Sequence, residues 1–316
     1  MRSKKEELMN NIEIIETGIY LPKPEVSNDK IEKRLGLEDG YIRKRTGIEK
    51  RFYSIGETIE KMALKAVNNL FEKNISKEGI GLIITATTTT NNLMPGISNY
   101  IQKHLKIEKC IALDILAGCS GYINAFDIAK MYIETGRVEK ALIIGVDILS
   151  RYIDVNDVST SVVLSDGAGA TLIEKSKQNK KYFSLIEAEE DNNEILTCKS
   201  EETIKMNGKE VYKYAVTNTT KNILDLLEKS NEKMEDIKYI IPHQSNLKIM
   251  NGIANRLKID KEKMYVNIDK VGNTFCASIP IAIDELKKEK LLKSGDKIIL
   301  LGYGGGLNTG SILLEI

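Results

Sequence analysis

Residues 113–122 have the sequence LDILAGCSGY, and this stretch is the best guide to the fold of the chain. A β-type run, Cys110–Leu113, leads into small residues, and a helix-like run, Tyr122–Glu134, follows. Cys119 is therefore predicted to lie on a strand-to-helix elbow. Because a helix N-terminus favours a thiolate, we expect a lowered pKa for the Cys119 thiol. The alternative is a structural cysteine buried beside a tight turn, a common environment for this residue type.

The composition predicts a soluble globular protein with no general attraction to nucleic acid or membranes. Its 316 residues, 42% of them hydrophobic and 29% charged, carry a net charge of +1. Four cysteines without a CxxC pair, and only two histidines, form no metal-binding pattern, and unpaired thiols favour a reducing cytoplasm. We expect no membrane span because apolar runs such as Ala141–Val146 are short, and residues 1–10, a charged N-terminal extension, contain no apolar signal core.

Short apolar runs alternate with helical stripes along the chain, as in α/β proteins. We predict strands at Ile12–Tyr20, Ile80–Ala86, Ala141–Val146, Ile237–Ile241 and Lys297–Leu301, with another beginning at Val266–Ile268. We predict helices at Glu57–Lys73, Pro95–Leu105, Tyr122–Glu134, Tyr214–Leu227 and Leu247–Leu257, with another running through Leu286. Val26–Arg45 is predicted to be polar and partly helical, and Asp166–Ala170 to be a loop of tight turns.

The spacing of these elements indicates a duplication. Ile83 and Ile144, in two buried strands, are 61 residues apart, and Ile240 and Leu300 are 60 apart. We therefore predict an N-terminal half, residues 11–175, and a C-terminal half, residues 176–316, packed as two similar sheets with helices between and outside. Sites in such folds form at the carboxyl ends of parallel strands.

Cys119, His243 and Asn273 all occupy such positions, although each has an ordinary structural interpretation. His243 could be a core histidine that hydrogen-bonds to the backbone, and Asn273 a turn residue between Gly272 and Thr274. The run Gly302–Gly306 is usually a loop, and too few residues follow it for a dinucleotide-binding unit. Its glycines could instead aim a backbone N–H group at a bound oxygen.

Several ordered motifs connect these residues to a known family. They are Ala117-Gly-Cys-Ser-Gly-Tyr122, Asp166-Gly-Ala-Gly169, Ile241-Pro-His-Gln-Ser-Asn246, Gly272-Asn-Thr274 and Gly302-Tyr-Gly-Gly-Gly306. In order and spacing the chain resembles β-ketoacyl-acyl-carrier-protein synthase III from about residue 11 to its end, including Arg45-Thr-Gly-Ile48 near the front. The resemblance implies a thiolase-like fold of duplicated αβ units, in five layers α-β-α-β-α, and a homodimer.

The resemblance also implies a decarboxylative Claisen condensation. Cys119 would accept the acyl primer, and the backbone N–H groups of Cys119 and Gly305 would bind the oxyanion. Malonyl-acyl carrier protein would then lose carbon dioxide, and neutral His243 and the Asn273 amide would donate hydrogen bonds to the enolate. No metal or other cofactor is implied. The substrates are an acyl-coenzyme A or acyl-carrier primer and malonyl-acyl carrier protein.

Family resemblance further implies substrate and carrier contacts. The substrate and coenzyme A contacts are Tyr41, Arg45, Met94, Gly208 and Asn246, with Met94 shaping the acyl pocket across the dimer. The basic residues Lys213, Lys248 and Arg256 match the carrier docking surface, although a solvated helix face would look the same.

The chain departs from the family pattern at several of these positions. Tyr41 replaces a common tryptophan and Val158 an arginine of the adenine clamp, Lys248 replaces an arginine, Met94 replaces a phenylalanine, and Phe275 and Cys276 stand where smaller residues are usual. These differences leave open the length and branching of the primer, its carrier and the pathway, including a specialised one outside routine fatty-acid initiation.

Other functions use similar residues. An acyltransferase of the same fold would move the Cys119 acyl group to an alcohol or amine, and the sequence leaves this alternative open. A cysteine peptidase also uses Cys, His and Asn in this order, but the chain lacks its tryptophan-containing signature and a duplication has no place in that fold. A non-catalytic partner subunit typically lacks the nucleophile, which is present here.

Overall fold

Two β-sheets form the frame of the protein in the computed structural model, which describes residues 12–199 and 202–316. The first sheet has the order β1-β7-β6-β4-β5. Its strands are β1 (Ile12–Tyr20), β4 (Ile80–Ala86), β5 (Ile111–Ile115), β6 (Lys140–Asp147) and β7 (Gly167–Lys175). The second sheet has the order β11-β12-β13-β8. Its strands are β8 (Tyr182–Ala188), β11 (Ile237–Pro242), β12 (Lys297–Gly304) and β13 (Asn308–Glu315). The predicted charged extension, residues 1–10, lies outside the described residues.

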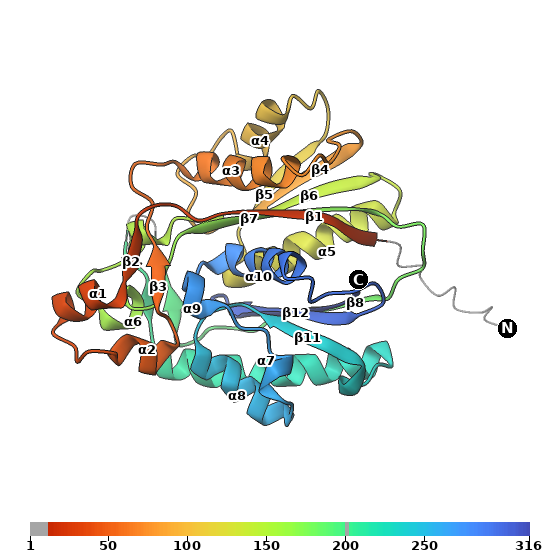
Figure 1. Cartoon of the computed structure of the whole chain (residues 1–316). Coiled ribbons are helices and arrows are strands. Elements are labelled where there is room, and N and C mark those ends of the chain that lie inside the picture. The colour runs from red at the N-terminus through yellow and green to blue at the C-terminus, as the bar shows by residue number, and fades with distance from the viewer. Residues whose placement is uncertain (1–11, 200–201) are drawn as a thin grey trace.

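Helices cover both faces of both sheets (Figure 1). Between the sheets lie α5 (Gly121–Glu134) and α10 (Ser278–Lys288), each of which contacts strands of both sheets. Outside the first sheet lie α3 (Ile59–Phe71) and α4 (Ile97–Leu105), and outside the second lie α7 (Gly208–Ser230) and α8 (Leu247–Leu257). The predicted five-layer order is therefore confirmed.

Shorter elements gather near the ends of the strands. The helices are α1 (Asn28–Leu35), α2 (Tyr41–Thr46), α6 (Val158–Ser161) and α9 (Ile268–Val271). The two-stranded ribbons pair β2 (Glu25–Ser27) with β3 (Lys50–Phe52), and β9 (Leu196–Thr197) with β10 (Lys205–Met206). The 3₁₀ turns are η1 (Gly118–Ser120), η2 (Leu149–Tyr152), η3 (Met234–Asp236), η4 (Lys261–Lys263) and η5 (Phe275–Ala277).

Parallel pairing brings the ends of the central strands together. β4 runs parallel to β5 and β6, and β11 runs parallel to β12, whereas the other pairs in the two sheets are antiparallel. Strands β4 and β6 are buried almost throughout, which explains their continuous apolar runs. The loops that leave the carboxyl ends of β5 and β11 carry Cys119 and His243.

Two predicted segments differ from the structure. Gly167–Lys175 is strand β7 rather than a loop of tight turns, because α10 packs directly on its backbone. A Cβ atom on Gly169 would lie 2.8 Å from Pro280 Cβ, so glycine here marks close packing. The strand predicted to begin at Val266–Ile268 is absent, since a single parallel bridge joins Ile240 to Met264 and Ile268 starts helix α9.

Within residues 12–199 and 202–316, no helix is both long enough and apolar enough to cross a bilayer. The longest of the packed helices named above, α7, has 23 residues, but charged residues such as Lys213, Lys221 and Asp225 interrupt its apolar positions.

Candidate active site

Cys119 lies on the predicted elbow. Strand β5 ends at Ile115, the turn η1 contains Cys119, and α5 begins two residues later. Gly118 enables the turn because its φ of 55° lies in the left-handed region, and the Ser120 hydroxyl donates to the Ala117 carbonyl oxygen at 2.7 Å. The side chain of Cys119 is almost fully buried, with 4% of its surface exposed.

The C-terminal half of the chain closes against this elbow through strand β12. A Cβ atom on Gly304 would lie 2.8 Å from the Cys119 Cβ atom, so only glycine permits this approach. Gly305 follows directly, and a Cβ atom on Gly118 would lie 3.6 Å from its backbone nitrogen. The backbone of Gly305 therefore lies beside the elbow, where an oxyanion-binding N–H group is needed. The predicted role of that N–H group stays a prediction.

His243 follows strand β11 and is held on several sides. Its backbone N–H group donates to Leu301 at 2.7 Å, and its Nδ1 atom lies 2.8 Å from the Ser278 hydroxyl oxygen. Phe275 and Tyr303 contact the ring edge-on, with ring centroids 6.3 and 5.4 Å away. Burial lowers the pKa of His243 to about 3, so the imidazole is neutral at physiological pH.

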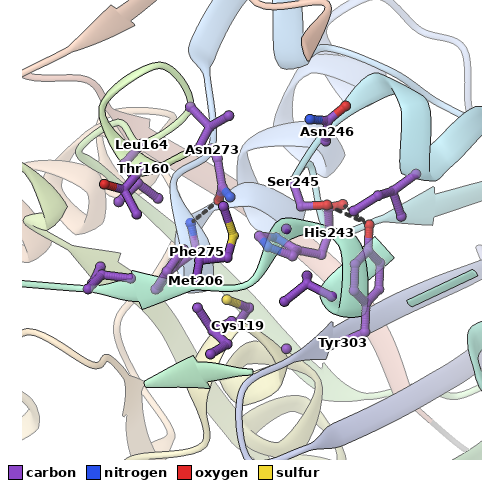
Figure 2. A pocket seen from close by; sticks show the side chains of 17 residues that line it. Cys119, Thr160, Leu164, Met206, His243, Ser245, Asn246, Asn273, Phe275 and Tyr303 are labelled. Atoms are coloured by element: carbon purple, nitrogen blue, oxygen red, sulfur yellow. Dashed lines mark hydrogen bonds between the residues drawn. The ribbon is translucent and has the colours of Figure 1, made fainter. Parts of the chain in front are cut away.

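Asn273 is oriented by its neighbours. Its backbone bonds to Val163 and Ser165 at 3.0 and 2.8 Å, which ties it to the N-terminal half. Its Oδ1 atom accepts a hydrogen bond from the Phe275 N–H group at 3.1 Å (Figure 2). Phe275 adopts a φ of 45°, an unusual value for a residue with a side chain. This hydrogen bond fixes the orientation of the amide, whose Nδ2 group is its hydrogen-bond donor.

Cys119, His243 and Asn273 line one cavity of about 100 Å³. Figure 2 shows the Cys119 sulfur below the Asn273 and His243 side chains. Much of the wall is apolar and includes Val163, Leu164, Leu196, Ile204, Met206 and Ile249. The predicted substrate contacts Gly208 and Asn246 also line this cavity. An apolar channel with a few polar groups at its base suits the arm of a thioester substrate.

The predicted lowering of the Cys119 pKa is wrong. Burial raises the pKa of the thiol well above its ordinary value, and the buried Asp147 carboxyl adds to the rise. The helix N-terminus lowers the pKa of the thiol, but this effect is smaller than the increase in pKa caused by loss of solvation of the buried thiolate. Cys119 is thus held mainly as a thiol and must give up its proton during the reaction.

Three predicted contacts lie outside the lining of this cavity. Tyr41 and Arg45 are on α2, where the Arg45 guanidinium lies 5.3 Å from the centre of the Tyr41 ring. Met94 is 83% exposed on the loop between β4 and α4. Their predicted contacts with coenzyme A and with a partner's acyl pocket stay predictions.

The three basic residues predicted to dock the carrier lie on two packed helices. Lys213 is on α7, and Lys248 and Arg256 are on α8. All three side chains are exposed. Arg256 donates to Thr217 on α7 at 3.3 Å, which places its guanidinium where the two helices meet. Their role in docking also stays a prediction.

The sequence alone did not identify three further residues around His243. The Ser245 and Tyr303 hydroxyls are 2.8 Å apart, and Tyr303 donates to the His243 carbonyl oxygen at 3.2 Å. Tyr303 belongs to the glycine motif, but an aromatic residue at a strand end has many uses. Ser278, at the start of α10, carries no sequence signal that separates it from other serines at helix starts.

Comparisons with known proteins agree with this geometry. Residues 113–192 match the family model described as 3-oxoacyl-[acyl-carrier-protein] synthase III, and residues 227–316 match the model of its C-terminal part. The β-ketoacyl-[acyl-carrier-protein] synthase III of Aquifex aeolicus is 41% identical over 304 residues, which covers 96% of this chain and 98% of that protein. The chain belongs to the 3-oxoacyl-[acyl-carrier-protein] synthase III family.

Solved structures of similar proteins confirm the fold. The crystal structure of the Aquifex aeolicus enzyme superposes with a TM-score of 0.93 at 40% identity, over 96% of this chain and 100% of that one. The priming β-ketosynthase of the R1128 polyketide pathway has a TM-score of 0.90 at 25% identity, over 100% of this chain and 98% of that one. The predicted thiolase-like fold and condensing-enzyme family are confirmed, and the peptidase alternative is wrong.

Proposed function

We propose that this protein joins an acyl primer, held as a thioester on Cys119, to the malonyl group of malonyl-acyl carrier protein. The products are carbon dioxide and a β-ketoacyl thioester on the carrier. One observation carries the proposal: a nucleophile and two hydrogen-bond donors, from both halves of the chain, line the same enclosed cavity. The reaction uses coenzyme A and carrier thioesters as substrates and no cofactor of the protein's own.

In the first step the primer moves to Cys119. The sulfur gives up its proton and attacks the thioester carbonyl carbon, so that a new carbon–sulfur bond forms. The bond to coenzyme A or to the carrier then breaks, and the departing sulfur takes up a proton. The N–H groups of Cys119 and Gly305 are assigned to the oxyanion, since both lie at the elbow.

In the second step the malonyl group loses carbon dioxide. The breaking carbon–carbon bond leaves its electron pair on an enolate, whose oxygen accepts hydrogen bonds from His243 Nε2–H and Asn273 Nδ2–H. The low pKa of His243 suits this role, because a neutral imidazole donates a hydrogen bond without surrendering a proton. The enolate carbon then attacks the acyl carbonyl on Cys119, and the Cys119 sulfur departs.

We further propose that the protein acts as a homodimer in the cytoplasm. Leu93, Met94 and Leu116 are large apolar side chains exposed to 97%, 83% and 76%, which supports a protein interface around the loop between β4 and α4. Met94 would then shape the partner's acyl pocket. None of the four cysteines forms a disulfide, which agrees with a reducing compartment.

Product analysis tests the proposed reaction. The protein is supplied with malonyl-acyl carrier protein and, one at a time, short straight or branched primers on coenzyme A or on the carrier. We expect β-ketoacyl carrier and carbon dioxide in equal amounts, both dependent on the primer, by mass spectrometry and radiolabel release. Transfer of the primer to an added alcohol or amine without malonyl-dependent carbon dioxide would instead support the acyltransferase alternative.

Reversing the charge of Lys248 and Arg256 should weaken docking of the carrier. With both changed to glutamate, we expect a higher KM for malonyl-acyl carrier protein and a nearly unchanged kcat. Because the net charge of +1 gives no general attraction, these exposed residues would act through local charge, which salt screens. Higher salt should therefore raise the wild-type KM in the same direction.

Small malonyl thioesters without a carrier provide the control for this double variant. They should react as well with the variant as with the wild type, since they lack the carrier that Lys248 and Arg256 are proposed to meet and neither residue lines the cavity. An equal loss with the small thioesters would show that the substitutions disturb the cavity or the fold. The docking assignment would then be wrong.

A further inference from the structure

Among the residues that the structure describes, the Nδ1 atom of His243 has one partner, the hydroxyl of Ser278. The two atoms are 2.8 Å apart, and both side chains are almost completely buried, with 1% and 0% of their surface exposed. Ser278 is the first residue of α10, the helix between the two sheets, so its hydroxyl is fixed from within the core. Backbone contacts and the edges of Phe275 and Tyr303 hold the rest of the histidine.

The acceptors available to the buried protons determine which atom donates in this hydrogen bond. Among residues 12–199 and 202–316, the Ser278 hydroxyl has no hydrogen-bond partner other than His243. If Nδ1 carried the ring proton and donated it to Ser278, the serine proton would be buried without an acceptor, which destabilises the folded state. If Ser278 donates to Nδ1, the serine proton has an acceptor, and the ring proton lies on Nε2, the nitrogen left to serve the cavity that His243 lines.

We propose that Ser278 is a positioning residue that fixes the Nε2–H tautomer of His243. The inference rests on the proposed function, because this tautomer presents a hydrogen-bond donor to the enolate oxygen in the cavity. A carboxylate at the same place would accept from Nδ1–H and turn Nε2 into a base. Serine thus suits stabilisation of an enolate, which needs donors and no strong base beside it.

Nitrogen NMR of the full-length protein reads the tautomer directly. The chain has only two histidines, and His104 is exposed on α4, so the two ¹⁵N-labelled rings are assigned with a His104→Gln variant. In the wild type we expect a protonated Nε2 and a bare Nδ1 for His243. A protonated Nδ1 would overturn the inference even if condensation proceeds normally, so its failure is distinct from failure of the proposed function.

Variants at position 278 link the tautomer to the chemistry. In Ser278→Ala, Nδ1 loses its donor, and we expect a mixture of tautomers and a malonyl decarboxylation rate at least about tenfold lower. The decrease should not exceed about 10²–10³-fold, the loss typical of removing one such donor completely. Acylation of Cys119 should change much less. Ser278→Thr, which keeps the hydroxyl, should restore both the tautomer and the rate.

Ser278→Asp should favour the other tautomer of His243. Its carboxylate should draw the ring proton to Nδ1 and raise the pKa of His243, so decarboxylation should fall below that of Ser278→Ala. Ser311→Ala is the matched control, because Ser311 is a fully buried serine whose hydroxyl bonds to Asn222 and not to the site. It should lower the melting temperature without moving the His243 resonances. An unchanged tautomer and rate in folded Ser278→Ala and Ser278→Asp would refute the proposal.

Discussion

Incubation of the protein with a short acyl-coenzyme A should add the mass of one acyl group, and Cys119→Ser should abolish the addition. A serine hydroxyl is far harder to deprotonate than a thiol, so loading should fall to background. Intact-protein mass spectrometry with peptide mapping measures the site. Cys119 is expected because it alone of the cysteines lines the cavity with His243 and Asn273.

The other cysteines are the control for this assignment. Cys276 is fully buried and its sulfur lies 3.2 Å from the Gly118 carbonyl oxygen, while Cys110 and Cys198 lie outside the cavity lining. Their serine variants should still load, and an acyl group found on any of these three cysteines would contradict the assignment.

The wild-type loading rate should also rise with pH, by about tenfold per unit while the thiol predominates, because burial raises the Cys119 pKa.

Asn273→Ala should slow malonyl decarboxylation by about 10²–10³-fold, the usual effect of removing one oxyanion donor. The hydrogen bond from the Phe275 N–H group to Oδ1 fixes the orientation of the Asn273 amide, whose Nδ2 group is its hydrogen-bond donor. Release of labelled carbon dioxide from malonyl-acyl carrier protein measures this step. Loading of Cys119 in the same variant should change much less, since the enolate does not exist in that step.

A variant of matched size sharpens the Asn273 prediction. Asn273→Asp keeps the shape of the side chain but places a carboxylate beside the developing negative charge, so decarboxylation should fall at least as far as in Asn273→Ala. Equal losses in loading and decarboxylation for both variants would show that Asn273 supports the cavity as a whole. The division of labour between Cys119 and the two donors would then be wrong.

The amino-acid sequence was sufficient for the family, the duplicated α/β fold and the three residues at the base of the cavity. Apolar runs such as Ile80–Ala86 and Ala141–Val146 are local patterns, and the sheets bury them as predicted. The elbow at Cys119 is also local, because Gly118 and the start of α5 lie within a few residues of it. The motifs around His243 and Asn273 assigned these two residues to the site through their resemblance to the family.

Local patterns were misleading where packing between distant segments decides the outcome. The sequence of Gly167–Ala170 resembles a turn because it is rich in small residues. In the structure this segment is part of a strand, and its small side chains allow α10 to pack closely against it. A strand begun at Val266 would extend the second sheet, yet only the bridge at Met264 forms. Propensity is a weak guide to such places because tertiary contacts override it.

Only the tertiary structure decided the electrostatics of the site and the partner of His243. The helix N-terminus at Cys119 predicts a lower pKa, but burial by the C-terminal half reverses the sign. The hydrogen bond between His243 and Ser278 joins residues 35 positions apart, on different elements. Desolvation and hydrogen-bond partners depend on what the whole fold brings around a group, and spacing along a chain carries no record of that.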